Sequence, residues 1–587
     1  MRATIKTLLV AAVALALISP GCRERQSADG PPAQPRDRLT CAELMRSEYQ
    51  DTVPLNNRYF TPLGRWESAR HEFEGTLIAP EFVMHNPEEE ADSANSWDYF
   101  PGFAVDFFTH EAHLVPTLRE AILADGDRSY WRIILSPGTV WFEPRDSGMS
   151  RASFPFTLVN DLFNDAHNGL ATFAYDETRV SSLFLQVTQE TSPVYKADFW
   201  GVTTVDYMPH SLENKNLLAA RFAEEVQSQT PILPFSALSE KADSALLETF
   251  NRGIEAEEIS ATGLIWNDTL YLQPCGTRYG DYPYRRGMRH AAYSLTKAMG
   301  PLIALLRLAE KYGDGVFDLK VADYVTIAAA HDGWESVTFA DALNMATGIG
   351  DNMPELVDPN VMQGDEDQPK FMSFLRAKSR QEKMDVAFSY GNYPWGPGEV
   401  ARYNSINTFI LSAAMDGFLK SKEGSDADIW EMVLAEVYRP IGIVYAPIMR
   451  TVEPDGSVGL PPFGYGLYPT VDDVAKISIL LHNGGRHQGR QILHAGRLAE
   501  AMFRTDATGL PTGESTECGS VTYHLGFNGL PYRSGDGRIH RIPVSTGFGG
   551  NHWVLLPNGM TTFRFTDVNR YGISTMIDVA EAIRPFD

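Results

Sequence analysis

The chain has 587 residues, of which 43% are hydrophobic and 21% charged. This is an ordinary globular composition, sufficient for two or more packed cores. The formal net charge of −25 argues against a nucleic-acid partner, because binding phosphates requires a basic surface.

The N-terminus has the pattern of an export signal. Arg2 and Lys6 precede an apolar stretch, Leu8 to Ile18, that is too short to span a membrane comfortably. Ser19-Pro20-Gly21-Cys22 follows and resembles a bacterial lipoprotein cleavage site, where lipid is attached to the cysteine. We expect residues 1–21 to be a signal peptide and Cys22 to carry the lipid. The expected location is extracytoplasmic, as a periplasmic or cell-envelope lipoprotein touching the membrane only through its anchor, with secretion as the alternative.

Two regions are predicted between the signal and the middle of the chain. Residues 22–44 are polar and rich in Pro without an apolar period, which predicts a tether. Short apolar and aromatic runs separated by turn residues follow, such as Tyr130–Leu135 and Thr139–Phe142. This pattern predicts a β-rich domain over 45–231, whose role the sequence does not indicate.

Cysteine and histidine spacing indicates neither a disulfide framework nor a metal centre. Beyond Cys22, three cysteines remain, and that odd number permits at most one internal bridge. Cys275 with Cys518 is one possible pair, and Cys41 is the third. His110-Glu111-Ala112-His113 has two histidines but no third ligand in view. We expect no metal and no cofactor.

The pattern changes around Pro231–Pro234, and residues 232–587 are predicted to be a second domain. Apolar residues recur about one turn apart over Ser236–Glu257, which predicts an amphipathic helix. A β-hairpin is predicted over Ala261–Leu272, with Asn267-Asp268 at its turn.

Ser294-Leu295-Thr296-Lys297 follows, where a polar loop gives way to an apolar helical run. A serine near a helix start lies in the field of unpaired backbone N–H groups, and Lys297 falls on the same helix face. A buried amine loses its proton readily and can help to take the serine proton. Ser-x-x-Lys is typical of acyl-transferring hydrolases, so Ser294 is predicted to be the nucleophile and Lys297 its partner.

Further segments accompany this motif in a fixed order: Phe317–Tyr324, Val337–Ile349, Gly396–Thr408, Gly464–Lys476 and Thr546–Asn551. The ordered set resembles the serine β-lactamase-like superfamily on its class C and esterase side, over about 236–587. The forms Leu-Asn-Met-Ala-Thr-Gly and Tyr-Asn-Ser-Ile-Asn-Thr are most similar to the branch that holds 6-aminohexanoate-dimer hydrolase. The resemblance implies an α/β fold of the β-lactamase/transpeptidase type, with an antiparallel sheet flanked by helices plus a helical lobe, here preceded by the β-rich domain. The active site is expected between sheet and lobe.

The resemblance implies that Tyr403 relays the proton and protonates the leaving group. A tyrosine has a reference pKa near 10, so it would need a neighbouring cation, Lys297, to act as a base at neutral pH. Ser405 stands where the class C pattern has an asparagine, and it can still donate a hydrogen bond to the substrate.

The last motif lacks the Lys or His of the family. One register places Phe548-Gly549-Gly550 there, and a second places Ser545-Thr546-Gly547. In the first register, Gly549 and Gly550 let the backbone approach the substrate, and the Asn551 N–H joins that of Ser294 as an oxyanion hole.

These motifs predict an exported serine hydrolase that cleaves an ester or amide through an acyl-enzyme on Ser294. One alternative is a β-lactamase or D-alanyl-D-alanine carboxypeptidase, whose substrates present a carboxylate that normally faces a cation. Another is a non-catalytic envelope binding or sensor protein. The expected partner is a small-molecule or peptide-like substrate, and the sequence fixes neither its identity nor the oligomeric state.

Overall fold

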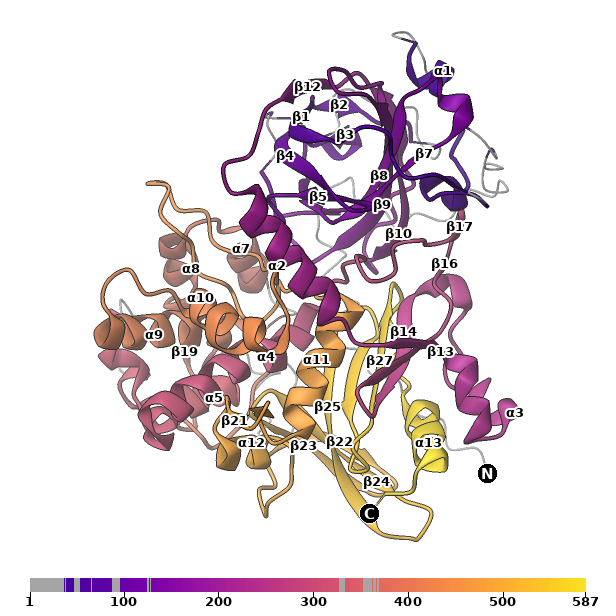
Figure 1. The fold of residues 1–587 in the computed structure, drawn as a ribbon. Coiled ribbons are helices and arrows are strands. Elements are labelled where there is room, and N and C mark those ends of the chain that lie inside the picture. Colours follow the sequence, from indigo (N-terminus) through magenta and orange to yellow (C-terminus); the bar gives the residue numbers. More distant parts are fainter. Residues whose placement is uncertain are drawn as a thin grey trace.

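The computed structural model describes Arg36 and residues 39–46, 53–64, 66–86, 96–123, 126, 128–326, 333–351, 362, 366 and 369–586. The predicted signal peptide and Cys22 lie outside the described residues. Figure 1 shows a β-rich unit, coloured indigo to magenta, above a larger unit of helices and strands that runs to the C-terminus.

The first unit is built on a ten-stranded antiparallel sheet. Its order is β11-β10-β9-β8-β7-β5-β4-β1-β12, and β6 pairs with β8 off this path. The strands are β1 (Glu74–Ala79), β4 (Phe103–His110), β5 (His113–Pro116), β6 (Arg132–Leu135), β7 (Gly138–Phe142), β8 (Ser150–Val159), β9 (Ala166–Tyr175), β10 (Leu183–Thr191), β11 (Trp200–Thr203) and β12 (Asp206–Pro209). A separate pair is formed by β2 (Phe82–Val83) and β3 (Tyr99–Phe100).

Strands β8, β9 and β10 are buried along their whole length. Alternate side chains of a strand point to opposite faces, and here both faces are covered. Ala171 and Leu185 pack into the core of the sheet's own unit. Leu170 and Phe184 instead pack with Tyr282, a residue of the second unit. The three strands therefore join two units as well as filling one core.

The predicted tether over 22–44 includes residues that are packed in the structure. Helix α1 (Cys41–Leu44) starts with a capping box between Thr40 and Glu43. Leu39, Cys41 and Leu44 are buried, and α1 lies against β9. The folded part of the chain therefore begins before residue 45. The segment is polar on average, but these apolar side chains are buried in the core.

The second unit contains a nine-stranded sheet of order β13-β15-β14-β27-β26-β25-β24-β23-β22, in which all pairs except β13–β15 are antiparallel. Its strands are β13 (Ile232–Pro234), β14 (Ile259–Trp266), β15 (Thr269–Leu272), β22 (Leu510–Thr516), β23 (Gly519–His524), β24 (Phe527–Arg533), β25 (Ile539–Gly547), β26 (Asn551–Leu555) and β27 (Thr561–Thr566). Short pairs are β16 (Gly276–Thr277) with β17 (Gly280–Asp281), β18 (Ile349–Gly350) with β19 (Gly391–Asn392), and β20 (Arg486–His487) with β21 (Arg490–Gln491).

Helices cover both faces of this sheet, with α13 on one side and α11 and α5 on the other (Figure 1). Side chains alternate accordingly: Val554 of β26 packs in the core that includes α13, and its neighbour Trp553 packs in the core of the helical side. The helices are α2 (Lys215–Gln227), α3 (Ser244–Leu247), α4 (Thr296–Met299), α5 (Pro301–Tyr312), α6 (Phe339–Leu343), α7 (Pro369–Arg376), α8 (Arg380–Ala387), α9 (Ser405–Glu423), α10 (Ile429–Val433), α11 (Val471–His482), α12 (Ala495–Ala501) and α13 (Ser574–Ile583). This is the predicted β-lactamase/transpeptidase-like fold, with a β-rich region before it.

One predicted element is wrong and a neighbouring one is confirmed. The segment 236–257 is not one helix but a 3₁₀ turn, Phe235–Glu240, followed by the short α3, which Asp243 caps. Its apolar residues are still buried in the core. Their regular spacing therefore indicated which residues are buried, but not that they form one continuous helix. The hairpin of β14 and β15 is present, and its turn residues Asn267 and Asp268 both have positive φ, as a type I′ turn requires.

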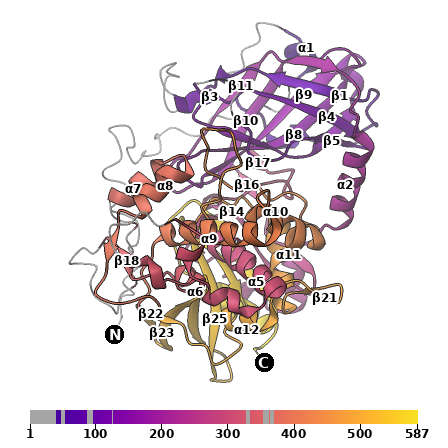
Figure 2. The ribbon, with the colours of Figure 1, turned by 90° about the vertical axis from the view of Figure 1, so that its left-hand side faces the viewer.

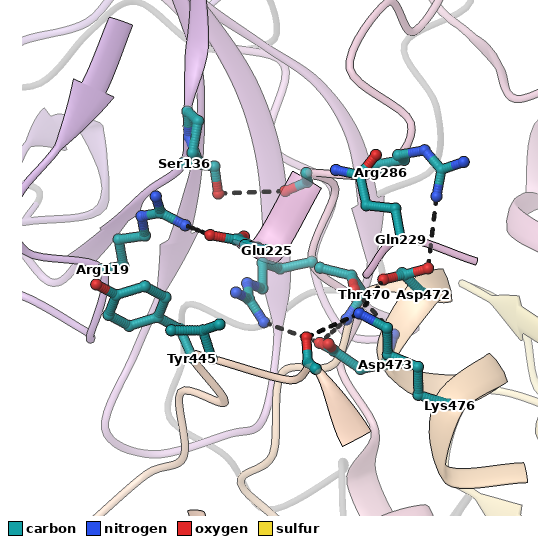
Figure 3. Close-up of a pocket in the computed structure, with 15 residues that line it drawn as sticks. Arg119, Ser136, Glu225, Gln229, Arg286, Tyr445, Thr470, Asp472, Asp473 and Lys476 are labelled. Carbon is teal, nitrogen blue, oxygen red and sulfur yellow. Dashed lines mark hydrogen bonds and ion pairs between the residues drawn. The ribbon is translucent and has the colours of Figure 1, made fainter. Parts of the chain in front are cut away.

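The two units meet over a broad polar and apolar interface. Arg278 makes two hydrogen bonds of 2.9 and 2.8 Å with Glu190 of β10, a buried carboxylate. A cavity of about 60 Å³ lies elsewhere at the junction, and Figure 3 shows Arg119 paired with Glu225 on one side of it. Lys476 and Asp472 pair on the other side. Figure 2 shows α2 descending from the edge of the first sheet toward the second unit. Among the described helices, none combines the length and apolar character that crossing a bilayer requires.

Candidate active site

Ser294 lies in a tight 3₁₀ turn, Tyr293–Leu295, directly before α4. Tyr293 has a positive φ of 45°, an uncommon conformation for a bulky residue. The expected helical run is divided into α4 and α5 at Gly300, where an added Cβ would lie 3.0 Å from the Thr296 carbonyl oxygen and 3.1 Å from the Phe463 ring. The division leaves Lys297 on a short helix of its own, one turn from the serine.

The amine of Lys297 is the centre of the site. It is only 2% exposed, and four oxygens surround it. Its Nζ lies 2.9 Å from Ser294 Oγ and 3.0 Å from the Tyr403 hydroxyl. It is also 2.8 Å from Ser405 Oγ and 2.9 Å from the Gly464 carbonyl oxygen. A neutral amine can donate to two of these oxygens and still accept a proton from Ser294.

Tyr403, from a distant part of the sequence, contacts both Ser294 and Lys297. It stands two residues before α9, and its hydroxyl lies 2.6 Å from Ser294 Oγ. The Lys297 amine also lies 4.6 Å from the centre of the Tyr403 ring. The three side chains predicted to carry proton transfer are therefore within hydrogen-bonding distance of one another.

Burial sets the protonation of these groups. It lowers the pKa of Lys297 to about 8, although the carboxylate of Glu366 acts in the opposite direction. Burial also raises the pKa of Tyr403 well above 10, and Glu366 adds to that shift. These shifts run against the expectation that Lys297 would make Tyr403 a base at neutral pH, because the raised pKa keeps Tyr403 a phenol.

Ser405 was expected to meet the substrate, but the structure places it against the lysine. Its side chain is buried and its Oγ contacts Lys297, while its backbone N–H donates to Glu366 at 2.6 Å. Gly464 packs beside it, and a Cβ there would lie 2.5 Å from that of Ser405. Ser405 and Gly464 therefore hold the amine, and the Asn-to-Ser departure changes the surroundings of Lys297.

The structure favours the second register of the last motif. Ser545-Thr546-Gly547 forms the end of β25, which runs beside the Tyr293–Leu295 turn that carries Ser294. A Cβ on Gly547 would lie 2.7 Å from the Ala292 carbonyl oxygen, so the close approach requires glycine. Phe548, the next residue, packs edge-to-face on Tyr293 with ring centres 5.5 Å apart.

The oxyanion roles expected for Gly549, Gly550 and Asn551 stay predictions, and the structure shows these residues in other contacts. Both glycines have positive φ and turn the chain from β25 into β26, and the Gly549 N–H donates to Asn569. Asn551 is completely buried, and its side chain donates to the carbonyl oxygens of Ala291 and Phe548. These residues stabilise the turn between β25 and β26. A glycine-rich sequence does not by itself show whether it forms such a turn or an anion-binding site.

Two basic residues near the last motif, His552 and Arg541, do not supply a positive charge to the site. Burial, with the neighbouring Arg564, holds the pKa of His552 well below its usual range, so the ring is neutral. Arg541 lies six positions before Gly547 on β25, which is about 20 Å along a strand. The described residues also contain no cluster of three or more potential metal ligands, and Cys41, Cys275 and Cys518 are free thiols.

Two residues that support this site from other parts of the chain were not predicted from the sequence. Glu366 contacts the Ser405 N–H, and Asn164 of the first unit contacts the backbone of Tyr293 at 2.7 Å. Neither belongs to a motif. Asn164 precedes Ser294 by 130 residues and lies in another unit, so only the tertiary structure could reveal the contact.

No protein-family model matches this sequence, and comparison with curated proteins gives no match. Solved structures similar to it include one assigned as a 6-aminohexanoate-dimer hydrolase from Bacillus anthracis, with 16% identity over 56% of this chain and 78% of that one, and a TM-score of 0.40. A family VIII carboxylesterase has 16% identity over 60% and 98% of the two chains, with a TM-score of 0.41. A penicillin-binding protein homologue from Caulobacter crescentus has 15% identity over 60% and 99%, with a TM-score of 0.39.

This likeness concerns the fold alone, because identity this low carries no information on substrate.

Reactivity of Ser294 should rise with pH as Lys297 loses its proton. Because the pKa of Lys297 is about 8, the neutral amine dominates only above that pH. The second-order rate constant for modification by a fluorophosphonate, measured from pH 6 to 10, should therefore rise about 100-fold from pH 6 to its plateau, with its midpoint near pH 8. A flat profile, or one that falls with pH, would contradict a lysine base.

Proposed function

We propose that this chain is a serine hydrolase that cleaves an ester or amide through an acyl-enzyme on Ser294. The observation that carries the proposal is the closed set of hydrogen bonds among Ser294, Lys297 and Tyr403. Burying an amine costs free energy, and a non-catalytic binding or sensor protein gains nothing from placing it beside a serine hydroxyl.

The first half of the reaction forms the acyl-enzyme. Neutral Lys297 takes the proton of Ser294 as Oγ attacks the carbonyl carbon of the substrate. The negative charge that develops on the carbonyl oxygen is stabilised by backbone N–H groups, for which Ser294 and Phe548 are the candidates in the favoured register. Tyr403 then gives its phenolic proton to the leaving oxygen or nitrogen and recovers one from Lys297, 3.0 Å away.

The second half releases the acid product and restores the enzyme. Water enters where the leaving group departed and loses a proton through the same pair of residues as it attacks the acyl carbon. Ser294 leaves with a proton, and Lys297 returns to the neutral amine. Ser405 and Gly464 contribute by fixing the lysine while its charge changes.

Replacement of each proposed residue tests the mechanism. Ser294→Ala should abolish labelling by a fluorophosphonate, followed by intact mass. Lys297→Ala and Tyr403→Phe should each lower turnover of p-nitrophenyl butyrate about 10²- to 10⁴-fold, because each removes a proton-transfer group. Ser425→Ala and Tyr312→Phe are matched controls at exposed positions and should behave like the parent. Undiminished labelling of Ser294→Ala would exclude it as the nucleophile.

Specificity should favour neutral esters and amides over β-lactams. A β-lactam carboxylate needs a facing cation, and the described end of β25 offers Ser545 and Thr546 in its place. We expect measurable kcat/KM for p-nitrophenyl butyrate and a lower value for a chromogenic cephalosporin. Faster hydrolysis of the cephalosporin would support the β-lactamase alternative instead.

Export and lipid attachment at Cys22 remain predictions from the sequence. In a bacterial host the parent should fractionate with membranes, and Cys22→Ala should move to a soluble extracytoplasmic fraction because it has lost its anchor. Unchanged membrane association of Cys22→Ala would rule out the lipid on this residue.

A further inference from the structure

A loop of the first unit reaches under the nucleophile turn of the second. Residues 160–165 connect β8 to β9, and Asn164 and Asp165 are both buried. Asn164 Oδ1 accepts a hydrogen bond of 2.7 Å from the Tyr293 N–H and one of 2.8 Å from the Gly466 N–H. Its Nδ2 lies 3.4 Å from the Leu467 carbonyl oxygen.

This one side chain joins the two segments that hold the reacting groups. Tyr293 is the residue before Ser294, and Gly466 lies two residues after Gly464, whose carbonyl oxygen contacts Lys297. The two segments also contact each other directly, through the Ala292 N–H and the Leu467 carbonyl oxygen at 3.1 Å. The Asn164 amide adds a contact from the other unit to both of them.

Asp165 holds the side chain of the same tyrosine. Its Oδ1 accepts a hydrogen bond of 2.5 Å from the Tyr293 hydroxyl and one of 3.0 Å from Ser192 Oγ. Tyr293 has a φ of 45°, a left-handed conformation that is strained for a residue with a Cβ. Such strain persists only where surrounding contacts over-determine it, and here Asn164 fixes the backbone and Asp165 the ring.

The loop that supplies these contacts is itself fixed. Asn160 Oδ1 accepts from the backbone N–H groups of Leu162 and Phe163 at 3.0 and 2.6 Å. Its Nδ2 donates to Asp165 Oδ2 at 3.2 Å. These hydrogen bonds lie within the loop and hold its conformation without the help of Tyr293, which is what positioning another residue requires.

Other contacts hold the two units together without this loop. The side chain of Asn168 pairs with the backbone N–H and C=O of Arg289, and the Tyr282 hydroxyl donates to the Gly169 carbonyl oxygen. Glu190 with Arg278 and the ion pairs around the cavity in Figure 3 lie elsewhere in the interface. Loss of Asn164 should therefore leave the units docked and act on the nucleophile turn.

We propose that Asn164 and Asp165 are positioning residues for Ser294, so that the N-terminal β-rich unit completes the active site of the C-terminal one. The proposal rests on the function proposed above, because it concerns the reactivity of Ser294. It also gives the first unit a definite role: it holds the strained turn in the conformation that points Ser294 at Lys297.

The test compares full-length variants at Asn164 with a matched control. Asn164→Leu removes both accepted hydrogen bonds, whereas Asn164→Asp keeps an oxygen acceptor. Asn86→Ala removes another buried asparagine of the same unit, one that donates to Asp98 at 3.2 Å within that unit. Kinetics with p-nitrophenyl butyrate and the rate of fluorophosphonate labelling provide the activity readouts.

We expect Asn164→Leu to lower kcat and the labelling rate by about 10- to 100-fold with KM little changed, since a small misplacement of the nucleophile has this effect. Asn164→Asp should recover part of the loss, and Asn86→Ala should keep both values near those of the parent. Tyr293→Phe, which removes only the hydroxyl bound by Asp165, should cause a smaller loss in the same parameters. If Asn164→Leu labels as fast as the parent, the proposal is wrong.

Hydrogen exchange separates this proposal from the proposed function. If the parent itself is not labelled, the hydrolase assignment fails, and exchange in peptides covering 290–298 and 462–468 still decides the positioning role. Faster exchange in both peptides for Asn164→Leu, but not for Asn86→Ala, would support it. Unchanged exchange would overturn it. Should Asn164→Leu not fold, Asn164→Asp and Tyr293→Phe give the same comparison.

Discussion

The buried amine of Lys297 is the constraint on which the site depends. An amine taken out of water must find hydrogen-bond partners, or it destabilises the fold that buries it. Here the partners are Ser294, Tyr403, Ser405 and the carbonyl oxygen of Gly464. These oxygens come from three separate stretches of chain, so the amine links the nucleophile turn, the start of α9 and the loop before α11. The hydrogen bonds that the buried amine needs for stability are therefore the same contacts that the proposed proton transfer would use.

The same burial decides the division of labour between the two proton-transfer groups. Removing water disfavours the charged form of each, which lowers the pKa of the lysine and raises that of the tyrosine. Above about pH 8 the result is a pair of neutral groups, an amine that can accept a proton and a phenol that can donate one.

The first unit is not a separable attachment to this machinery. Strands β8, β9 and β10 are buried on both faces, and one of those faces is covered jointly by the N-terminal segment around α1 and by the second unit. The segment from Tyr282 to Tyr293, which leads into the nucleophile, lies along that face and hydrogen-bonds to Gly169, Asn168 and Asn164 in succession. Polar groups of each unit therefore find their hydrogen-bond partners in the other unit.

The sequence by itself determined the local features of this protein. Ser294 and Lys297 are three residues apart, so any helical turn brings them together, and the positive φ of Asn267 and Asp268 could be expected from the residue types at a hairpin turn. The ordered motifs were sufficient for the fold of the second unit, since an antiparallel sheet between helices follows from their resemblance.

Only the tertiary structure decided what depends on contacts between distant segments. It showed that Ser405 faces the lysine, that Gly549, Gly550 and Asn551 brace a turn, and that Gly547 is the glycine at the nucleophile. Glycine-rich strand ends look alike in sequence, because the reason for each glycine is the atom that a Cβ would meet. The contribution of Asn164 was hidden for the same reason: a single buried amide acts through two backbone N–H groups, and backbone groups leave no pattern of side chains to recognise.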